Sequence, residues 1–182
     1  MKVVSGKYKG RSILGFDLDG TRPTMDRVKE SMFAMIQGNI RNSVCLDLFS
    51  GSGNLGIEAL SQGAQDVFFT DKNKKACVVI KKNLDNLGIN FNNILNLDYR
   101  RALEYYKEKN ISFDVLFLDP PYDTDFIKNS IEKITEYNLV NDNGIIVCES
   151  NCLDKIVYDS SIYMSIKERK YGDKWVVIIK KI

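Results

Sequence analysis

From Val44 onward, hydrophobic and polar positions follow two alternating patterns. Short apolar runs of strand length alternate with segments whose apolar residues recur every three or four positions, as on one face of a helix. Because the short runs are apolar at most positions, we expect strands buried on both faces of a parallel sheet, joined by right-handed helical crossovers. The predicted strands are residues 44–49, 66–70, 93–97, 113–118 and 145–149, and the predicted helices are residues 53–62, 74–87, 99–109 and 124–137.

The two ends of the chain depart from this pattern. Residues 162–170 and 174–180 are separated only by residues 171–173, which leaves no room for a crossover helix, so they are predicted to form an antiparallel hairpin. Before the first strand, apolar residues share one face of a predicted helix that Thr24 can cap and that extends to Gly38. Residues 1–18 mix Lys, Gly and Arg with short apolar stretches, which is typical of a basic β-hairpin or arm.

Length and composition set limits on this picture. A chain of 182 residues can form one α/β domain with a full core, so we expect a single domain, with residues 1–20 as a basic arm and residues 21–182 as the core. No apolar run reaches transmembrane length and no leader begins at Met1, so a cytoplasmic protein is expected. The chain has no histidine and no Cys-x-x-Cys pair, which argues against a histidine base and a zinc site and favours buried free thiols.

A glycine-rich loop follows the first predicted strand. Gly51, Gly53 and Gly56 form a G-x-G-x-x-G pattern where a helix begins, and Asp71 ends the next strand. Glycines let a ligand lie against the backbone, and an acid on the second strand can accept both ribose hydroxyls. This much fits a nicotinamide dinucleotide and S-adenosylmethionine equally well. Asp47 favours S-adenosylmethionine, because a carboxylate facing the loop repels a pyrophosphate and attracts an ammonium group.

Residues around this loop make up the predicted cofactor site. Asp98 ends the third predicted strand, and two interpretations of it remain open: contact with an adenine amino group, and capping of the helix that begins at Tyr99. The complete predicted set of cofactor-binding residues is Asp47, Phe49, Gly51, Ser52, Gly53, Asp71 and Asp98.

The chain leaves the fourth predicted strand through Asp119, Pro120, Pro121 and Tyr122. The two prolines hold the backbone extended and remove two donors. The Asp119 carboxylate, the Pro120 carbonyl and the Tyr122 ring are thereby expected at the carboxyl end of a strand, where open α/β sheets bind ligands. Two acceptors beside an aromatic ring suit a planar group with an amino donor, such as a nucleobase; the alternative is an ordinary strand-to-helix turn. Asp119, Pro120 and Tyr122 are therefore predicted to be catalytic, and Pro121 and Tyr122 to contact substrate.

Charge is unevenly distributed along the chain. The net charge is +2, but the first 29 residues contain seven basic residues against three acids. This basic N-terminal part indicates a partner that carries phosphates, although a solvated surface is the simpler alternative. Lys2, Lys7, Lys9 and Arg11 are the predicted phosphate contacts. For Arg22 and Arg27, closure over the active site and a structural role both remain open.

These motifs together resemble a known family. L-D-L-F-S-G-S-G at residues 46–53, Asp71 and D-P-P-Y at residues 119–122 resemble class I S-adenosylmethionine-dependent methyltransferases of the amino-methylating group. G-K-Y-K-G-R, R-P-T-M-D-R-V-K-E-S-M-F and Y-G-D-K narrow the resemblance to the bacterial 16S rRNA guanine-N2 methyltransferases, over essentially the whole chain. R-P-T-x-D-R-V is the most specific part, since D-P-P-Y is shared with DNA methyltransferases. At the ribose-binding acid the family often has Glu where this chain has Asp71.

The resemblance implies a Rossmann-like class I methyltransferase with a mostly parallel seven-stranded sheet, helices on both faces and a C-terminal antiparallel hairpin. It also implies S-adenosylmethionine as cofactor and a guanine in the 16S rRNA of the assembled or assembling small subunit as substrate. We further expect a monomer without metal. A DNA adenine-N6 or cytosine-N4 methyltransferase is the nearest alternative, but too few residues are left for a target-recognition region. A nicotinamide-dependent oxidoreductase conflicts with Asp47, and a catalytically silent RNA-binding module conflicts with the acids expected at the site.

Overall fold

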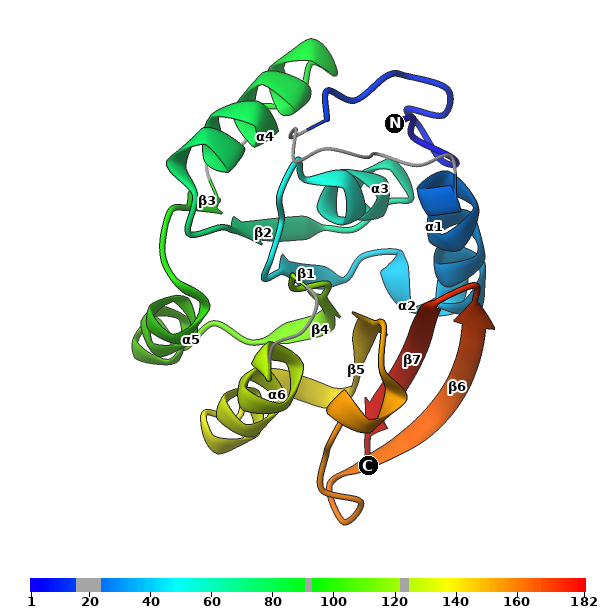
Figure 1. Cartoon of the computed structure of the whole chain (residues 1–182). Helices are drawn as coiled ribbons and strands as arrows, with labels where there is room; N and C mark the ends of the chain where they lie inside the picture. The colour runs from blue at the N-terminus through cyan, green and yellow to red at the C-terminus, as the bar shows by residue number, and fades with distance from the viewer. Residues whose placement is uncertain (16–23, 91–92, 122–124) are drawn as a thin grey trace.

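The computed structural model describes residues 1–15, 24–90, 93–121 and 125–182. Within these residues the chain forms a sheet of seven strands in the order β3-β2-β1-β4-β5-β7-β6 (Figure 1). The strands β3, β2, β1, β4 and β5 are parallel, and β7 pairs antiparallel with both β5 and β6. The strands are β1 (Val44–Asp47), β2 (Asp66–Thr70), β3 (Ile94–Leu95), β4 (Phe113–Leu118), β5 (Val140–Ser150), β6 (Tyr163–Tyr171) and β7 (Lys174–Lys181). The predicted mostly parallel sheet and its antiparallel C-terminal hairpin are confirmed.

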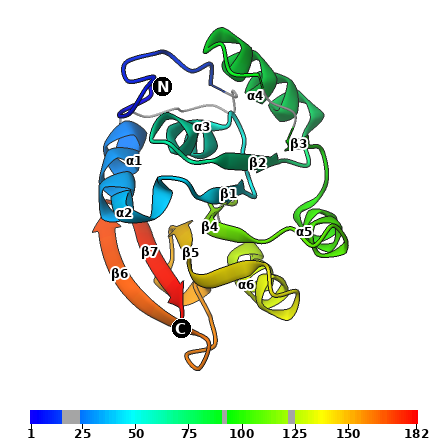
Figure 2. The ribbon, with the colours of Figure 1, turned by 180° about the vertical axis from the view of Figure 1, so that it is seen from behind.

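Helices cover both faces of this sheet. Figure 1 and Figure 2 show α1, α3 and α4 on one side of the sheet and α5 and α6 on the other. The helices are α1 (Thr24–Met35), α2 (Gln37–Ile40), α3 (Asn54–Ser61), α4 (Lys74–Asn86), α5 (Tyr99–Glu108) and α6 (Phe126–Glu136), and the 3₁₀ turn η1 spans Leu153–Lys155. Within the described residues, none of the helices has the length and apolarity needed to cross a bilayer.

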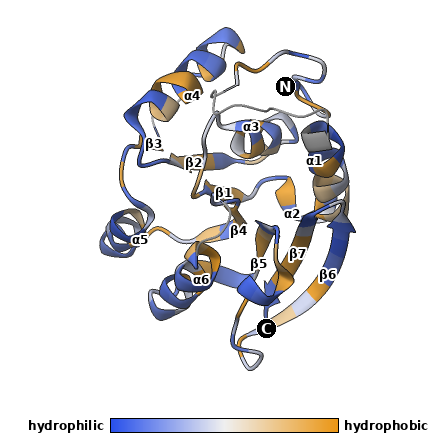
Figure 3. Ribbon diagram, in the orientation of Figure 1, coloured by the Kyte–Doolittle hydropathy of each residue, from blue (hydrophilic) through white to orange (hydrophobic). Residues whose placement is uncertain are grey.

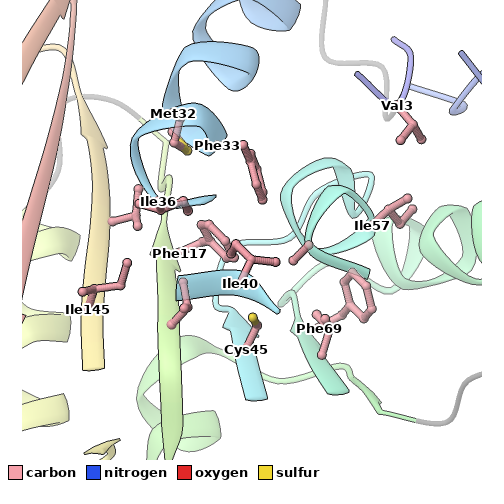
Figure 4. Packing of buried hydrophobic residues seen from close by; sticks show 14 of the residues in the cluster. Val3, Met32, Phe33, Ile36, Ile40, Cys45, Ile57, Phe69, Phe117 and Ile145 are labelled. Atoms are coloured by element: carbon pink, nitrogen blue, oxygen red, sulfur yellow. The ribbon is translucent and has the colours of Figure 1, made fainter. Parts of the chain in front are cut away.

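The core has two layers, one on each face of the sheet. Adjacent strand residues point to opposite faces, so Cys45 belongs to the layer under α1, α3 and α4, whereas Leu46 belongs to the layer under α5 and α6. Figure 4 shows the first layer, where the Phe33 and Phe117 rings lie 5.5 Å apart. Figure 3 shows hydrophobic residues gathered on the central strands and hydrophilic ones on much of α4, α5 and β6. Strands buried on both faces explain the continuous apolar runs.

Several element boundaries differ from the sequence prediction. β5 begins at Val140, five residues before the predicted start, because it continues through Asn143 and Gly144 past an irregularity in its pairing with β4. β3 contains only two paired residues, and β1 ends at Asp47. The first helix ends at Met35, and α2, which was not predicted, follows and buries Ile40.

The N-terminal segment is hairpin-like but docked. A single antiparallel bridge joins Lys2 and Ser12, and residue 3 exchanges backbone hydrogen bonds with residues 10 and 11. Val3 is buried in the core, and the amide of Lys7 donates to the Ser61 carbonyl of α3 at 2.7 Å. The N-terminal segment therefore packs on α3 and contributes to the core. Residues 16–20 of the predicted arm lie outside the described residues.

The cysteines divide into two pairs. Cys45 and Cys148 are buried free thiols, as predicted, and burial raises the pKa of Cys45 to about 12. Cys77 and Cys152 are free but half-buried, because they lie near the ends of their elements, so the prediction of burial is wrong for these two.

Candidate active site

A cleft opens where β1, β4 and β5 end. It encloses about 530 Å³ of space, part of which is open to solvent. Three carboxylates from these strands line it, together with side chains of α1 and of the loop that enters α3. The lining residues are Met1, Lys29, Asp47, Phe49, Ser50, Ser52, Asn54, Leu55, Asp119 and Glu149. The predicted residues Asp47, Phe49, Ser52 and Asp119 are thus brought together in one site.

The glycine loop forms the tight turn that its sequence predicts. The backbone φ angles of Gly51 and Gly53 are 53° and 80°, in the left-handed region that glycine adopts most easily. The Gly53 amide donates to the Ser50 carbonyl at 2.7 Å, which closes the turn before α3. At Gly56 a Cβ atom would lie 2.3 Å from Phe69 Cε1, so the third glycine lets α3 pack closely against β2.

Asp47 lies at the base of this loop. Its side chain is 2% exposed, and its Oδ2 accepts a hydrogen bond from the Gly56 amide at 3.0 Å. Burial raises the pKa of Asp47 to about 7; the Gly56 amide opposes this shift and the Asp71 carboxylate adds to it. A carboxyl group held near its titration point is stabilised as an anion when a cation binds beside it.

Asp71 meets the same loop from β2. Its Oδ2 accepts from the Gly51 amide at 2.9 Å, and its Oδ1 accepts from the Asn73 amide at 2.8 Å. These bonds hold the half-buried carboxylate against the glycine turn, in the position expected of an acid beside a ribose. Contact between Asp71 and a cofactor stays a prediction.

Phe49 lines the cleft, whereas Asp98, which precedes α5, is not among the residues that line it. Asp98 is the N-cap of α5 and accepts from the Arg100 amide at 3.0 Å, which confirms the capping interpretation. A further contact of Asp98 with adenine stays a prediction. The Phe49 ring lies parallel to that of Phe126, with centroids 6.0 Å apart, and 5.5 Å from that of Tyr99. This aromatic cluster provides a flat apolar wall.

The exit from β4 places Asp119 in the cleft. Asp119 is half-buried, Pro120 is buried and Pro121 is exposed, while Tyr122 lies outside the described residues. Loss of solvent raises the pKa of Asp119 well above its usual value; Glu149 and Asp47 add to this shift and Lys174 opposes it. Asp119 is therefore one of a group of acids whose negative charges repel one another.

Lys29 is a site residue that sequence reasoning missed. It is 2% exposed, and its Nζ lies 3.1 Å from Glu58 Oε2 and donates to the Lys2 carbonyl and to Asn54 Oδ1, both at 2.7 Å. Burial lowers the pKa of Lys29, and Glu58 opposes the shift. A signal was present, because Lys29 shares the helical face of Met32, Phe33 and Ile36, which the structure buries.

Glu149 was also missed. It lies one residue before the end of β5, is 6% exposed and forms an ion pair with Lys174 of β7. Its position gave a signal, because an acid at the carboxyl end of a strand next to the Asp119 strand falls at the ligand-binding edge of the sheet.

The predicted substrate-binding cations lie away from the cleft lining. Lys7, Lys9, Arg11 and Arg27 are exposed, and Arg22 lies outside the described residues. Arg11 donates to the Asn86 carbonyl at the end of α4 at 2.8 Å, and the Lys7 ammonium lies 5.2 Å from the centre of the Tyr8 ring. Glu58 fixes the backbone that carries these residues, because it accepts from the Val4 and Ser5 amides at 2.9 Å.

Comparison with known proteins agrees with this geometry. The family model described as "Conserved hypothetical protein 95" matches residues 1–180. The ribosomal RNA small subunit methyltransferase D of Buchnera aphidicola (subsp. Baizongia pistaciae) is 34% identical over 172 residues, which are 93% of this chain and 86% of that protein. The chain belongs to this methyltransferase family.

Two further matches cover the full length of this chain. YlbH of Bacillus subtilis is 37% identical over 182 residues, covering 100% of this chain and 99% of YlbH. The solved structure of yhhF from Escherichia coli has the same fold, with a TM-score of 0.86 at 23% identity over 100% of this chain and 97% of that one. The resemblance predicted from the glycine loop, D-P-P-Y and R-P-T-M-D-R-V is thereby confirmed.

Proposed function

We propose that this protein transfers a methyl group from S-adenosylmethionine to the exocyclic N2 amino group of a guanine in the 16S rRNA of the assembled or assembling small ribosomal subunit. It does so as a cytoplasmic monomer whose 182 residues form one domain. The observation that carries the proposal is the convergence of Asp47, on the glycine loop, with Asp119, on the D-P-P-Y exit, in one cleft. Membership of a family that includes ribosomal RNA small subunit methyltransferase D supports the substrate class.

The cleft suits the charge of this cofactor. Asp47, Asp119 and Glu149 line it, and Lys29 directs its amine at Glu58, Asn54 and the Lys2 carbonyl. A pyrophosphate would meet these carboxylates, whereas the ammonium group of an amino acid would neutralise one of them. Asp47 and Ser52 would hold the amino-acid end, Asp71 the ribose hydroxyls, and Phe49 and Asp98 the adenine, against a backbone kept open by Gly51 and Gly53.

Cofactor affinity is expected to increase with pH up to neutrality. Because the pKa of Asp47 is about 7, acid protonates the carboxylate that would pair with the ammonium group, so affinity should fall by up to about tenfold per pH unit below that value. Titration calorimetry with S-adenosylmethionine over a pH series measures this dependence. Asp47→Asn should bind weakly and lose most of the pH dependence, whereas an unchanged dependence in that variant would remove Asp47 from the cofactor site.

Asp119 and Pro120 would act on the amino group itself. S-adenosylmethionine supplies a methyl group bound to a sulfonium. The Asp119 carboxylate and the Pro120 carbonyl would accept hydrogen bonds from the two N–H groups of the guanine amino group and so draw its lone pair out of the ring plane. The N2–CH3 bond would form as the S–CH3 bond breaks, which leaves S-adenosylhomocysteine, and one amino proton would pass to Asp119 or to water. Positioning and fixed electrostatics then provide the acceleration, without a covalent intermediate. Pro121 and Tyr122 would contact the flipped base, with Tyr122 stacking on it.

Lys7 and Lys9 would contact rRNA phosphates together with Arg11, Arg22 and Arg27. Changing both lysines to serine is expected to weaken binding of the small subunit and to reduce the slope of log affinity against log salt by roughly 1 for each lost phosphate contact. Filter binding over a salt series gives this slope. Lys81→Ser/Lys82→Ser, which removes two exposed lysines from α4, is the matched control and should leave the slope unchanged. Equal slopes in both double variants would refute the role of Lys7 and Lys9.

Transfer of a radiolabelled methyl group tests the proposed function. Label from S-adenosylmethionine should enter the RNA of unmethylated small subunits and no DNA. Label in duplex DNA alone would instead support a DNA adenine or cytosine methyltransferase. Absence of label from all of the substrates would contradict the proposal.

A further inference from the structure

Glu149 of β5 and Asp119, which directly follows β4, come after a pair of aligned residues. In the parallel pairing of β4 with β5, Leu118 lies opposite Cys148, so the residue after each of them is an acid. Neighbouring strands lie about 4.8 Å apart, and both acids line the cleft. The edge of the sheet therefore presents the Asp119 and Glu149 carboxylates side by side to a planar group that binds in the cleft.

Lys174 keeps the second carboxylate in place. It begins β7, directly after the turn at residues 171–173, and its amine pairs with Glu149 Oε1. Lys174 is 24% exposed and Glu149 only 7% by side chain, so the pair lies largely away from solvent. The lysine of the Y-G-D-K motif, Lys174, thus pairs with an acid of the cleft, Glu149. Like charge from Glu149 also contributes to the raised pKa of Asp119, which agrees with their proximity.

We propose that Glu149 determines base specificity by accepting a hydrogen bond from the N1–H of the target guanine, with Lys174 as a positioning residue that holds its carboxylate in place. This inference rests on the proposed function. In guanine, N1, one of the two ring nitrogens beside the amino group, carries a hydrogen. In adenine and cytosine the corresponding nitrogen carries a lone pair instead, which a carboxylate repels. One acid thereby favours guanine and disfavours both other amino-bearing bases.

The test compares guanine with 2-aminopurine at the mapped target position of a small-subunit RNA reconstituted into particles. 2-Aminopurine keeps the amino group but has an unprotonated N1. The wild-type protein should methylate guanine at least about tenfold faster than 2-aminopurine, because N1 of the analogue presents a lone pair to the Glu149 carboxylate where guanine presents a hydrogen. In Glu149→Gln the side-chain amide can donate to the bare nitrogen, so the ratio of the two rates should fall by about tenfold or more.

Controls separate recognition from folding. Glu149→Asp, which keeps the charge, should retain the preference for guanine, and Glu168→Gln on exposed β6 should match the wild type. Lys174→Met should lower the rate of methylation of guanine and should also lower the ratio of the guanine rate to the 2-aminopurine rate. Equal rates for guanine and 2-aminopurine with the wild-type protein would overturn the inference, and this measurement needs no variant. A folded Glu149→Gln protein with an unchanged ratio of the two rates would also overturn it. A wild-type protein that methylates no guanine would instead contradict the proposed function.

Discussion

Replacing Asp119 with alanine is expected to slow methyl transfer about a hundredfold or more while leaving cofactor affinity largely unchanged. Asp119 directly follows β4 and lines the cleft, and loss of one preorganised polar group from such a site costs roughly this factor. Single-turnover transfer to small subunits gives the rate, and calorimetry with S-adenosylmethionine gives the affinity.

A nearby acid provides the control for this variant. Asp125 is exposed just before α6, so Asp125→Ala should keep the wild-type rate. A wild-type rate in Asp119→Ala would remove Asp119 from the chemistry. A large loss of cofactor affinity in that variant would place Asp119 with the cofactor instead of with the base.

Replacing Lys29 with methionine is expected to lower the free energy of unfolding by about 3 to 5 kcal/mol, the usual result of breaking a buried ion pair from one side. Glu58 is 0% exposed, and without Lys29 its charge would lose the cation 3.1 Å away. Two further hydrogen bonds of Lys29, to the Lys2 carbonyl and to Asn54, would also be lost. Chemical denaturation followed by circular dichroism measures the change.

Two comparisons show whether burial is the cause. The double variant Lys29→Met/Glu58→Gln should be more stable than Lys29→Met alone, because the second substitution removes the unpaired charge. Lys133→Met breaks the exposed pair with Glu136 and should leave stability nearly unchanged. A Lys29→Met protein as stable as the Lys133→Met protein would show that the Lys29–Glu58 pair does not hold α1 and the N-terminal segment on α3.

Local patterns predicted most of the fold, because each buried strand and amphipathic helix carries its own periodicity. β2 and β4 have the predicted bounds, since continuous apolar runs end sharply at polar residues. β5 was predicted too short, because Asn141, Asp142, Asn143 and Gly144 have the composition of a turn, whereas the pairing of Val140 with β4 extends the strand. Strand boundaries of this kind depend on pairing between distant segments, and a local sequence pattern carries no information about that pairing.

The candidate site was predicted in part for the same reason. Asp47, Asp71 and Asp119 follow strands in sequence, so a parallel sheet necessarily brings their ends to one edge. Lys29 and Glu149 were missed because their partners, Glu58 and Lys174, lie 29 and 25 residues away in the chain and on different elements. A charge in an apolar helical face or at the end of a buried strand is the only local trace of such a pair.

The identity of the methylated nucleoside tests the account most directly. Small subunits that lack the modification would be incubated with the protein and S-adenosylmethionine, and their RNA digested to nucleosides for mass spectrometry. The account predicts N2-methylguanosine, formed at one position of the 16S rRNA and absent when Asp119→Ala replaces the wild-type protein. N6-methyladenosine, N4-methylcytidine or no new methylated nucleoside would contradict it.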